Sequence, residues 1–483
     1  MSILYYIFAV YGIIIMMTKK KFFLIALICF VCYVPYLVFF FPGVCNWDTV
    51  GQISDYFGGD SPIPIGWMEG QDEITPFLSD HHPVFDTVVF SLFIKFGIAV
   101  FNSANIGFFA YVLVQTIVFS ITFAFVIYVL KRLGLGKKYI IAVGVFYTLF
   151  LPIPFFVIDM LKDSLFTLCF IWYFMIYLLV ILEKPTKKKI VALTLIGVLL
   201  GLTKKTGVYI LLLSALAIMP KIWHNFRLLS VFYVLSCPLV MFVLMAKIIF
   251  PIFNIEPGGK QELLAIPIQQ ISRVAVEKDF DSEEREIIGK IISYDQIKDL
   301  YRSDLVDPIK GTFNHDASQN EILDFLKLWI ATGFKEPELY LRAMYGLVGG
   351  FFIPNTTINI NTKIPEPWRG SPEIKQLDAF TIERQNIVDF YYGVANSPLL
   401  GILFKIAIYT FIIPISAGIY LAIRRDWQLL WGMIPVLLVI ATLFLCPTTD
   451  SRYGLPLIMT TPIVVGLGLK SYRNWASAKK RIA

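Results

Sequence analysis

The chain has 483 residues, of which 57% are hydrophobic and only 16% charged, and its mean hydropathy is +0.70. About 25% of the residues of an ordinary soluble protein are charged, so this composition predicts a protein that crosses a membrane several times. The net charge of +7 could suggest nucleic-acid binding, but the basic residues cluster in short connections between apolar segments. Such clusters orient membrane proteins, so we expect membrane lipids and no nucleic acid as partners.

Eleven apolar segments predict membrane spans, because about 20 apolar residues, or slightly fewer, cross a bilayer. The connections between them alternate in charge, and connections rich in lysine or arginine stay in the cytoplasm. This rule places the N-terminus outside and the C-terminus in the cytoplasm. The predicted spans are residues 2–17, 22–41, 104–130, 139–158, 164–182, 190–203, 207–220, 228–250, 399–423, 428–446 and 453–469.

The first outer loop, residues 42–103, is where we expect the chemistry. Its first part, residues 42–83, has no lysine or arginine. Carboxylates held at the outer membrane surface are suited to accept a proton from a substrate presented there. The acidic residues of this part are Asp48, Asp55, Asp60, Glu69, Asp72, Glu73 and Asp80.

A helix is predicted at the start of this loop, with Asn46 as its N-cap. Asp48, Gln52 and Asp55 recur at helical spacing, so they share one face of the helix. The helix dipole alone favours an acid such as Asp48 in the first turn. Its position directly after a long span, in a loop that also contains two histidines, favours a functional role instead.

The loop continues with His81-His82-Pro83, which leads into the apolar residues 84–101. The histidines could be metal ligands, acid/base groups or polar residues near a substrate. Neighbouring residues point to different sides, so we do not expect both to bind one ion. Residues 84–101 contain Asp86 and Lys95, and counting them as a span would move later basic loops outside. We therefore predict an interfacial or re-entrant helix here.

The second outer turn contains Asp159, Lys162 and Asp163. The two aspartates are four residues apart, so both carboxylates share one face if the turn stays helical. A structural pair between aspartate and lysine at the start of a helix is the alternative.

Cations also occur at other predicted outer turns. Lys204 and Lys205 separate two short spans, and Arg452 with Tyr453 begins the last one. These cations could bind a lipid-linked phosphate, with arginine donating two parallel hydrogen bonds, or they could anchor ordinary lipid headgroups. Arg273, in the long outer segment, is a further candidate.

The predicted fold is an all-α polytopic membrane protein with about 11 transmembrane helices, organised in three parts. Residues 1–250 form an N-terminal transmembrane region with the outer loop 42–103. Residues 251–398 carry helix-spaced apolar residues and predict an extracytoplasmic, mainly helical domain. Residues 399–483 supply the last transmembrane helices and a basic cytoplasmic tail. Common signatures of nucleotide binding, zinc peptidases and α/β-hydrolases do not occur in the sequence.

This layout resembles the GT-C superfamily of integral membrane glycosyltransferases, and is similar to a group of multi-span proteins from low-GC Gram-positive bacteria. The resemblance covers most of the chain in architecture, although each motif is short. It implies a bacterial cell membrane as the location, with the active site facing outside. The motifs that carry it are Trp47-Asp48-Thr49, His81-His82-Pro83, Lys162-Asp163-Ser164 and Arg452-Tyr453.

The resemblance implies inverting transfer of a sugar from a polyprenyl-phosphate-linked donor to a glycan, lipid or protein acceptor. Asp48 would activate the acceptor hydroxyl, and Asp163 or Asp159 would orient the acceptor or a divalent cation such as Mg²⁺ or Mn²⁺. The chain differs from some relatives in lacking the paired Asp-Glu, and from oligosaccharyltransferases in lacking the Trp-Trp-Asp motif. The residues that would hold the donor phosphate are Lys204, Lys205 and Arg452.

Two other functions are compatible with the sequence. A surface-polysaccharide polymerase or ligase also combines many spans with a large outer loop, and would rely on arginine and histidine residues of that loop. A transporter of lipid-linked glycans would show internal repeats and broken helices around a midplane cavity. The sequence has no convincing repeat, and its charged residues concentrate near the predicted outer surface.

Overall fold

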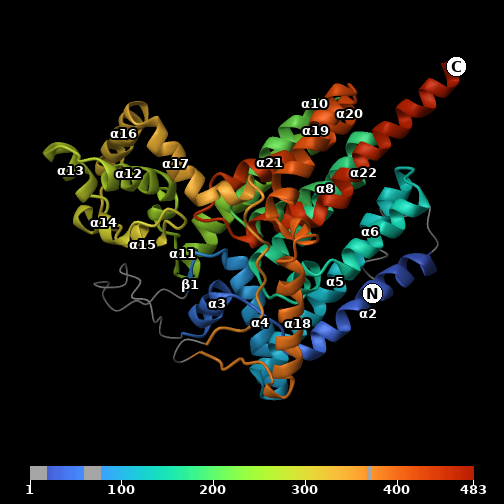
Figure 1. Cartoon of the computed structure of the whole chain (residues 1–483), viewed down its shortest axis with the longest axis horizontal. Helices are drawn as coiled ribbons and strands as arrows, with labels where there is room; N and C mark the ends of the chain where they lie inside the picture. Colours follow the sequence, from blue (N-terminus) through green and yellow to red (C-terminus); the bar gives the residue numbers. More distant parts are fainter. Residues whose placement is uncertain (1–18, 59–77, 367–370, 483) are drawn as a thin grey trace.

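The computed structural model describes residues 19–58, 78–366 and 371–482 (Figure 1). These residues are mostly α-helical, and the strands among them are two short parallel ones, β1 (Leu78–Ser79) and β2 (Ile255–Glu256). The predicted span 2–17 lies outside the described residues. So do four of the acidic residues of the first loop, namely Asp60, Glu69, Asp72 and Glu73.

Among the described residues, six helices are long and apolar enough to cross a membrane. This length and composition are those of a multi-pass membrane protein. Four of the helices agree closely with predicted spans, while residues 84–101 were expected to lie at the interface. The six are α2 (Lys19–Phe39), α4 (Val84–Phe101), α5 (Ala104–Arg132), α8 (Lys162–Leu182), the helix Thr206–Ile252 and the segment Ser451–Ser477 of α22 (Ser451–Ile482).

The other predicted spans form shorter or interrupted helices, so the predicted number of about 11 is not confirmed. Prolines cause several interruptions, because a proline lacks the N–H that an internal helical position requires. Pro152, for example, starts a new helix within the predicted span 139–158. The pieces are α6 (Lys137–Leu149), α7 (Pro152–Val157), α9 (Lys187–Thr203), η6 (Gly401–Phe404), η7 (Ile408–Ile412), α19 (Ile413–Ile423), α20 (Trp427–Gly432) and α21 (Ile434–Leu443).

The helix Thr206–Ile252 is folded back on itself. It comprises α10 (Thr206–Pro238), η1 (Leu239–Ile249) and α11 (Phe250–Ile252), and its backbone leaves the helical conformation at Phe226. Tyr173 Oη lies 2.6 Å from Ser214 Oγ and 2.5 Å from Tyr233 Oη. In a straight helix, residues so far apart in sequence would be separated by about 28 Å. The chain therefore reverses near Phe226, which matches the two predicted spans 207–220 and 228–250.

The basic connections gather at one end of the helix bundle, which we call the basic end. There the Lys221 ammonium donates to the carbonyl oxygen of Ile181, and Gln428 Nε2 donates to the same oxygen at 2.7 Å. Lys470 Nζ donates to the Leu133 carbonyl at 3.1 Å. The connections predicted to lie in the cytoplasm thus meet in space.

The helix α4 lies on the side of the molecule opposite the basic end (Figure 1). His82, just before it, contacts the first residue of α8, and Asn105, just after it, exchanges two hydrogen bonds of 3.0 Å with the backbone of Lys375. It packs against α5 through Gly97 and Gly107. The helix α4 is one of the six that are long and apolar enough to cross a membrane, so its interfacial or re-entrant placement stays a prediction.

Residues 260–351 form a helical lobe at the left of Figure 1. Two of its helices begin with capping boxes, formed by Asp281 with Glu284 and by Ser318 with Glu321. After the lobe, residues 357–366 and 371–377 are mostly extended and precede α18 (Thr381–Ala395), where the buried Tyr391 donates to the Ile358 carbonyl at 2.7 Å. The helices of the lobe are α12 (Ala265–Glu277), α13 (Ser282–Gly289), α14 (Ile297–Leu300), α15 (Asp307–Lys310), α16 (Gln319–Lys335) and α17 (Pro337–Val348).

Candidate functional site

The helix α3 (Trp47–Phe57) positions Asp48 in its first turn. As predicted, Asn46 caps this helix, and its Oδ1 accepts a hydrogen bond of 3.1 Å from the Thr49 amide. The hydroxyl of Thr49 also donates to the Met160 carbonyl at 2.6 Å. The first turn of α3 is therefore held against the turn that precedes α8.

Charged side chains from separate elements converge on Asp48. Its Oδ2 lies 2.8 Å from Lys162 Nζ, at the start of α8, and 2.5 Å from Arg452 Nη1, at the start of α22. The side chains are only 23%, 12% and 15% exposed, respectively. We call the group formed with their neighbours the charge cluster. It consists of Asp48, His82, Lys162, Asp163, Lys204 and Arg452.

The two histidines of the first loop have different partners. His82 Nδ1 lies 2.8 Å from Lys162 Nζ, while His81 Nδ1 lies 3.7 Å from a carboxylate oxygen of Glu262 near the lobe. Burial and the neighbouring Lys162 hold the pKa of His82 well below its usual range. His82 is therefore neutral near pH 7, and its Nδ1 accepts the hydrogen bond from Lys162. The two rings also contact each other, with their centres 4.5 Å apart.

A second ion pair adjoins the first through Tyr453. Lys204 Nζ lies 2.5 Å from Asp163 Oδ1, and the Asp163 side chain is 1% exposed. The same ammonium lies 4.7 Å from the centre of the Tyr453 ring. Arg452 Nη2 donates to Tyr453 Oη at 3.0 Å. The tyrosine thus contacts one cation from each pair, which places three cations and two carboxylates in one buried group.

Asp48 is ionised in this environment. Burial alone raises the pKa of its carboxyl group, but the charges of Lys162 and Arg452 outweigh that effect and hold the pKa well below its usual range. The cluster therefore presents a carboxylate and several cations side by side near neutral pH. Such a set can bind an anion through its cations and accept a proton at its carboxylate.

A model of a protein family matches residues 71–482, which is most of the chain. The chain belongs to the DUF6020 family. This is a family of unknown function, and the match includes every residue of the charge cluster except Asp48. No curated protein and no solved structure matches the chain.

Asp159 of this DUF6020 protein does not share a helix face with Asp163, because the turn does not stay helical as the shared face required. The helix α8 begins only at Lys162, and Asp159 lies before it in an extended turn that bridges to Val44. Its Oδ2 accepts a hydrogen bond of 2.9 Å from Asn361 Nδ2, and burial raises the pKa of Asp159 well above its usual range. Burial therefore disfavours the charged form of Asp159, and its hydrogen bond to Asn361 links this turn to the outer segment.

The remaining predicted residues of the first loop lie beside the cluster or away from it. Gln52 is buried, and its Nε2 donates to Thr87 Oγ1 at 2.8 Å. Asp55, near the end of α3, is half-buried, and burial raises its pKa to about 6. Lys205 pairs with Asp80 at 3.0 Å, so it does not join Lys204 in the cluster as predicted.

Arg273 belongs to a different part of the DUF6020 protein. It pairs with Glu277 within α12, and its guanidinium lies 6.0 Å from the centre of the Tyr301 ring. These contacts lie within the lobe. The prediction that Arg273 takes part in the same site as Arg452 is therefore not supported by its contacts.

Sequence reasoning missed the importance of Asp86. This aspartate lies in the first turn of α4, is 0% exposed, and neither of its carboxyl oxygens has a hydrogen-bond partner. It interacts electrostatically with Lys162 and Asp163. The signal in the sequence was an acid inside an apolar run, but the run alone does not tell which neighbour the acid faces.

The described residues do not form a divalent-cation site. No three histidine, cysteine, aspartate or glutamate side chains come together in residues 19–58, 78–366 and 371–482 in a way that could hold a metal ion. Within the cluster, ammonium and guanidinium groups occupy the positions around Asp48 and Asp163. The donor set therefore does not fit the Mg²⁺ or Mn²⁺ that the resemblance left open.

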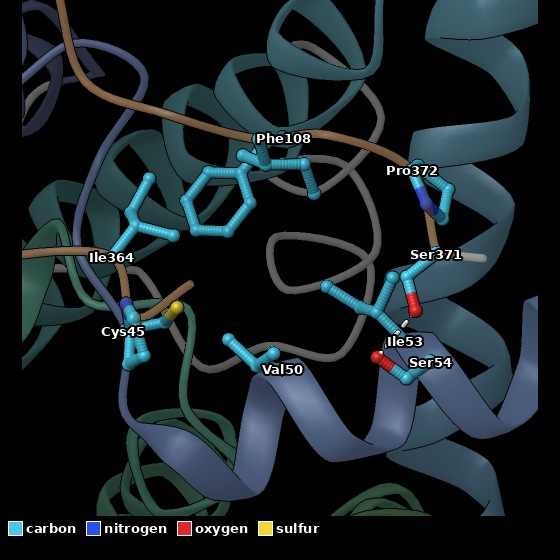
Figure 2. A pocket seen from close by; sticks show the side chains of 10 residues that line it. Cys45, Val50, Ile53, Ser54, Phe108, Ile364, Ser371 and Pro372 are labelled. Atoms are coloured by element: carbon cyan, nitrogen blue, oxygen red, sulfur yellow. Dashed lines mark hydrogen bonds between the residues drawn. The ribbon is translucent and has the colours of Figure 1, made fainter. Parts of the chain in front are cut away.

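A small apolar pocket lies beside α3 (Figure 2). Ser54 Oγ and Ser371 Oγ hydrogen bond at its edge at 2.7 Å. The pocket contains no residue of the charge cluster, so it belongs to the packing of α3 against the extended outer segment. Its lining is Cys45, Val50, Ile53, Ser54, Phe108, Ile364, Pro365, Ser371, Pro372 and Ile374.

Proposed function

We propose that this DUF6020 protein is a membrane glycosyltransferase of the GT-C type. It moves a sugar from a polyprenyl-phosphate-linked donor to a glycan, lipid or protein acceptor on the outer face of a bacterial membrane. The observation that carries the proposal is the convergence of Asp48, Lys162 and Arg452 from three elements into one buried group. A carboxylate beside cations suits a reaction that removes a proton and releases a phosphate.

The cations of the cluster would bind the donor phosphate. Arg452 has a planar fork of N–H groups that matches two phosphate oxygens, and Lys162 and Lys204 add point charges. Two apolar helices, α8 and α22, begin at or next to residues of this group, and they suit a donor whose lipid tail stays in the membrane.

Asp48 would act as the general base. The acceptor hydroxyl oxygen attacks the anomeric carbon of the sugar, and the bond from that carbon to the phosphate oxygen breaks. The electron pair of the broken bond leaves with the polyprenyl phosphate, whose added charge is stabilised by Lys162 and Arg452. The hydroxyl proton passes to Asp48, and attack opposite to the leaving group inverts the anomeric configuration.

The orientation in the membrane is part of the proposal. The charge cluster and the basic end lie at opposite ends of α8, since Lys162 begins this helix and the Ile181 carbonyl near its end binds Lys221. Lysine- and arginine-rich connections stay in the cytoplasm, so the cluster would face outside.

The test is a comparison of the wild-type protein with Asp48→Asn. Each purified protein is incubated with radiolabelled polyprenyl-phosphate sugars and bacterial membrane acceptors, and release of label from the lipid is followed. We expect transfer by the wild type and a loss of at least about 100-fold in the variant, because general-base catalysis contributes about that much. Asp55→Asn, on the same helix, serves as the matched control and should retain activity. Equal transfer by Asp48→Asn and the wild type would remove Asp48 from the mechanism.

A further inference from the structure

We propose that Asp48 is held inactive by the same cations that bind the donor phosphate, so that arrival of the donor releases the base. This inference rests on the proposed function. A single carboxylate oxygen, Asp48 Oδ2, receives both Lys162 Nζ at 2.8 Å and Arg452 Nη1 at 2.5 Å. The carboxylate thus occupies the anion position between the two cations.

Arg452 has two further neighbours, although its Nε makes no hydrogen bond. Its Nη2 donates to Tyr453 Oη at 3.0 Å, and its Nε lies 3.3 Å from a carboxylate oxygen of Asp450. A phosphate that bridges Arg452 and Lys162 must displace Asp48 Oδ2, because this oxygen lies in contact with both Arg452 Nη1 and Lys162 Nζ. Displacing Asp48 frees Nη1, and it also frees part of the coordination of Lys162, whose remaining neighbour is the neutral His82.

Displacement changes the chemistry of the carboxylate. With both cations in place, the pKa of Asp48 lies well below its usual range, so Asp48 holds a proton only weakly. Once a phosphate neutralises Lys162 and Arg452, the carboxylate loses this stabilisation, and burial then raises its affinity for a proton. The acceptor hydroxyl is therefore activated only when the donor is bound.

The experiment measures binding of polyprenyl phosphate to the full-length protein in nanodiscs of phosphatidylcholine. If Asp48 competes with the phosphate, Asp48→Asn binds this probe about tenfold more tightly than the wild type, although the variant has lost transfer activity. Asp450→Asn is the matched control, because it removes the same charge from Arg452 without touching Lys162. It should change the affinity by less than about threefold, as expected for a partly exposed pair. Polyprenol without a phosphate should bind equally to all three proteins.

Equal or weaker binding of polyprenyl phosphate by Asp48→Asn would overturn the inference, while transfer by the wild type would leave the proposed function intact. An equal gain in Asp450→Asn would overturn it too, because general charge would then explain the effect. The absence of both binding and transfer in the wild type would overturn the proposed function itself.

A second measurement uses only the wild type, in case the variant does not fold. Carbodiimides modify protonated carboxyl groups, and mass spectrometry locates the modified residue. Modification of Asp48 should increase when polyprenyl phosphate is added. A decrease, as simple shielding by the probe would cause, would overturn the inference.

Discussion

At the scale of single residues, the arginine of the charge cluster makes contacts that differ from those of its lysines. Arg452 contacts Asp48 and Tyr453 through two different nitrogens, which a lysine ammonium cannot reproduce in one plane. Lys162 and Lys204, in contrast, each make one short ion pair. The proposed phosphate site therefore assigns the orienting role to the arginine.

Arg452→Lys is expected to lower kcat/KM for the donor by about tenfold to a hundredfold, because charge-assisted hydrogen bonds contribute about 1.5–3 kcal/mol. Steady-state kinetics with the labelled donor measure the effect. Arg273→Lys, in the lobe, is the matched control and should behave like the wild type. If both variants lost the same activity, the proposed role of Arg452 would be wrong.

Asp55 should make stability depend on pH. Burial raises its pKa from 3.8 to about 6 in the folded protein, so the folded state binds an extra proton between these values. Stability therefore falls as the pH rises through this window. The Asp55→Asn variant has no titratable group at this position. It is therefore expected to raise the melting temperature at pH 7 while leaving it nearly unchanged at pH 4. Thermal unfolding at pH 4, 5, 6 and 7 tests this, and a difference that stays constant over the series would contradict it.

At the scale of elements, the sequence predicted the presence of helices better than the residues at which they begin and end. The pattern located α2, α5 and α8 closely because each is a single apolar run. It joined α6 to α7, since hydropathy is averaged over a window and the effect of Pro152 is local. It left the place of Asp159 open for a similar reason. The residue at which α8 begins decides whether Asp159 and Asp163 share a helix face.

Replacing a glycine by alanine is expected to change stability in opposite directions at two positions, because only one of them lies in the close packing of α4 on α5. A Cβ atom at Gly97 would lie 2.2 Å from the backbone nitrogen of Gly107, whereas one at Gly393 in α18 would meet nothing within 4 Å. Gly97→Ala should therefore lower the melting temperature markedly, because backbone must move. Gly393→Ala should stabilise the protein slightly, by about 0.5–1 kcal/mol. Thermal unfolding in detergent measures both, and a stable Gly97→Ala would contradict the packing.

At the scale of the whole molecule, the alternation of basic connections was the strongest sequence signal. It grouped Lys221 and Lys470 on one side, and both lie at the basic end. The cluster itself could be predicted only in part. Asp48, Lys162 and Arg452 were candidates because of their positions next to spans. The sequence does not contain the distances among segments so far apart, so it could not show that Lys205 and Arg273 form ion pairs outside the charge cluster.

Cysteine labelling can test the proposed orientation. Leu263, in the lobe, is 83% exposed, and Ile423, near the basic end, is 73% exposed. In intact cells, a membrane-impermeant maleimide should label Leu263→Cys but not Ile423→Cys. After permeabilisation both should react, and the parent protein supplies the background from its own cysteines. Labelling of Ile423→Cys in intact cells would reverse the orientation.

The pairing of β1 with β2 has a practical consequence. Leu78 lies opposite Ile255 and Ser79 opposite Glu256, so the short chain before His82 is hydrogen bonded to the chain that enters the lobe. A gene fragment that starts at Pro251 would encode β2 without its neighbour. The lobe expressed in this way would keep an unpaired strand edge, and such edges favour aggregation. A crystallisable lobe would therefore need the β1 sequence fused ahead of it.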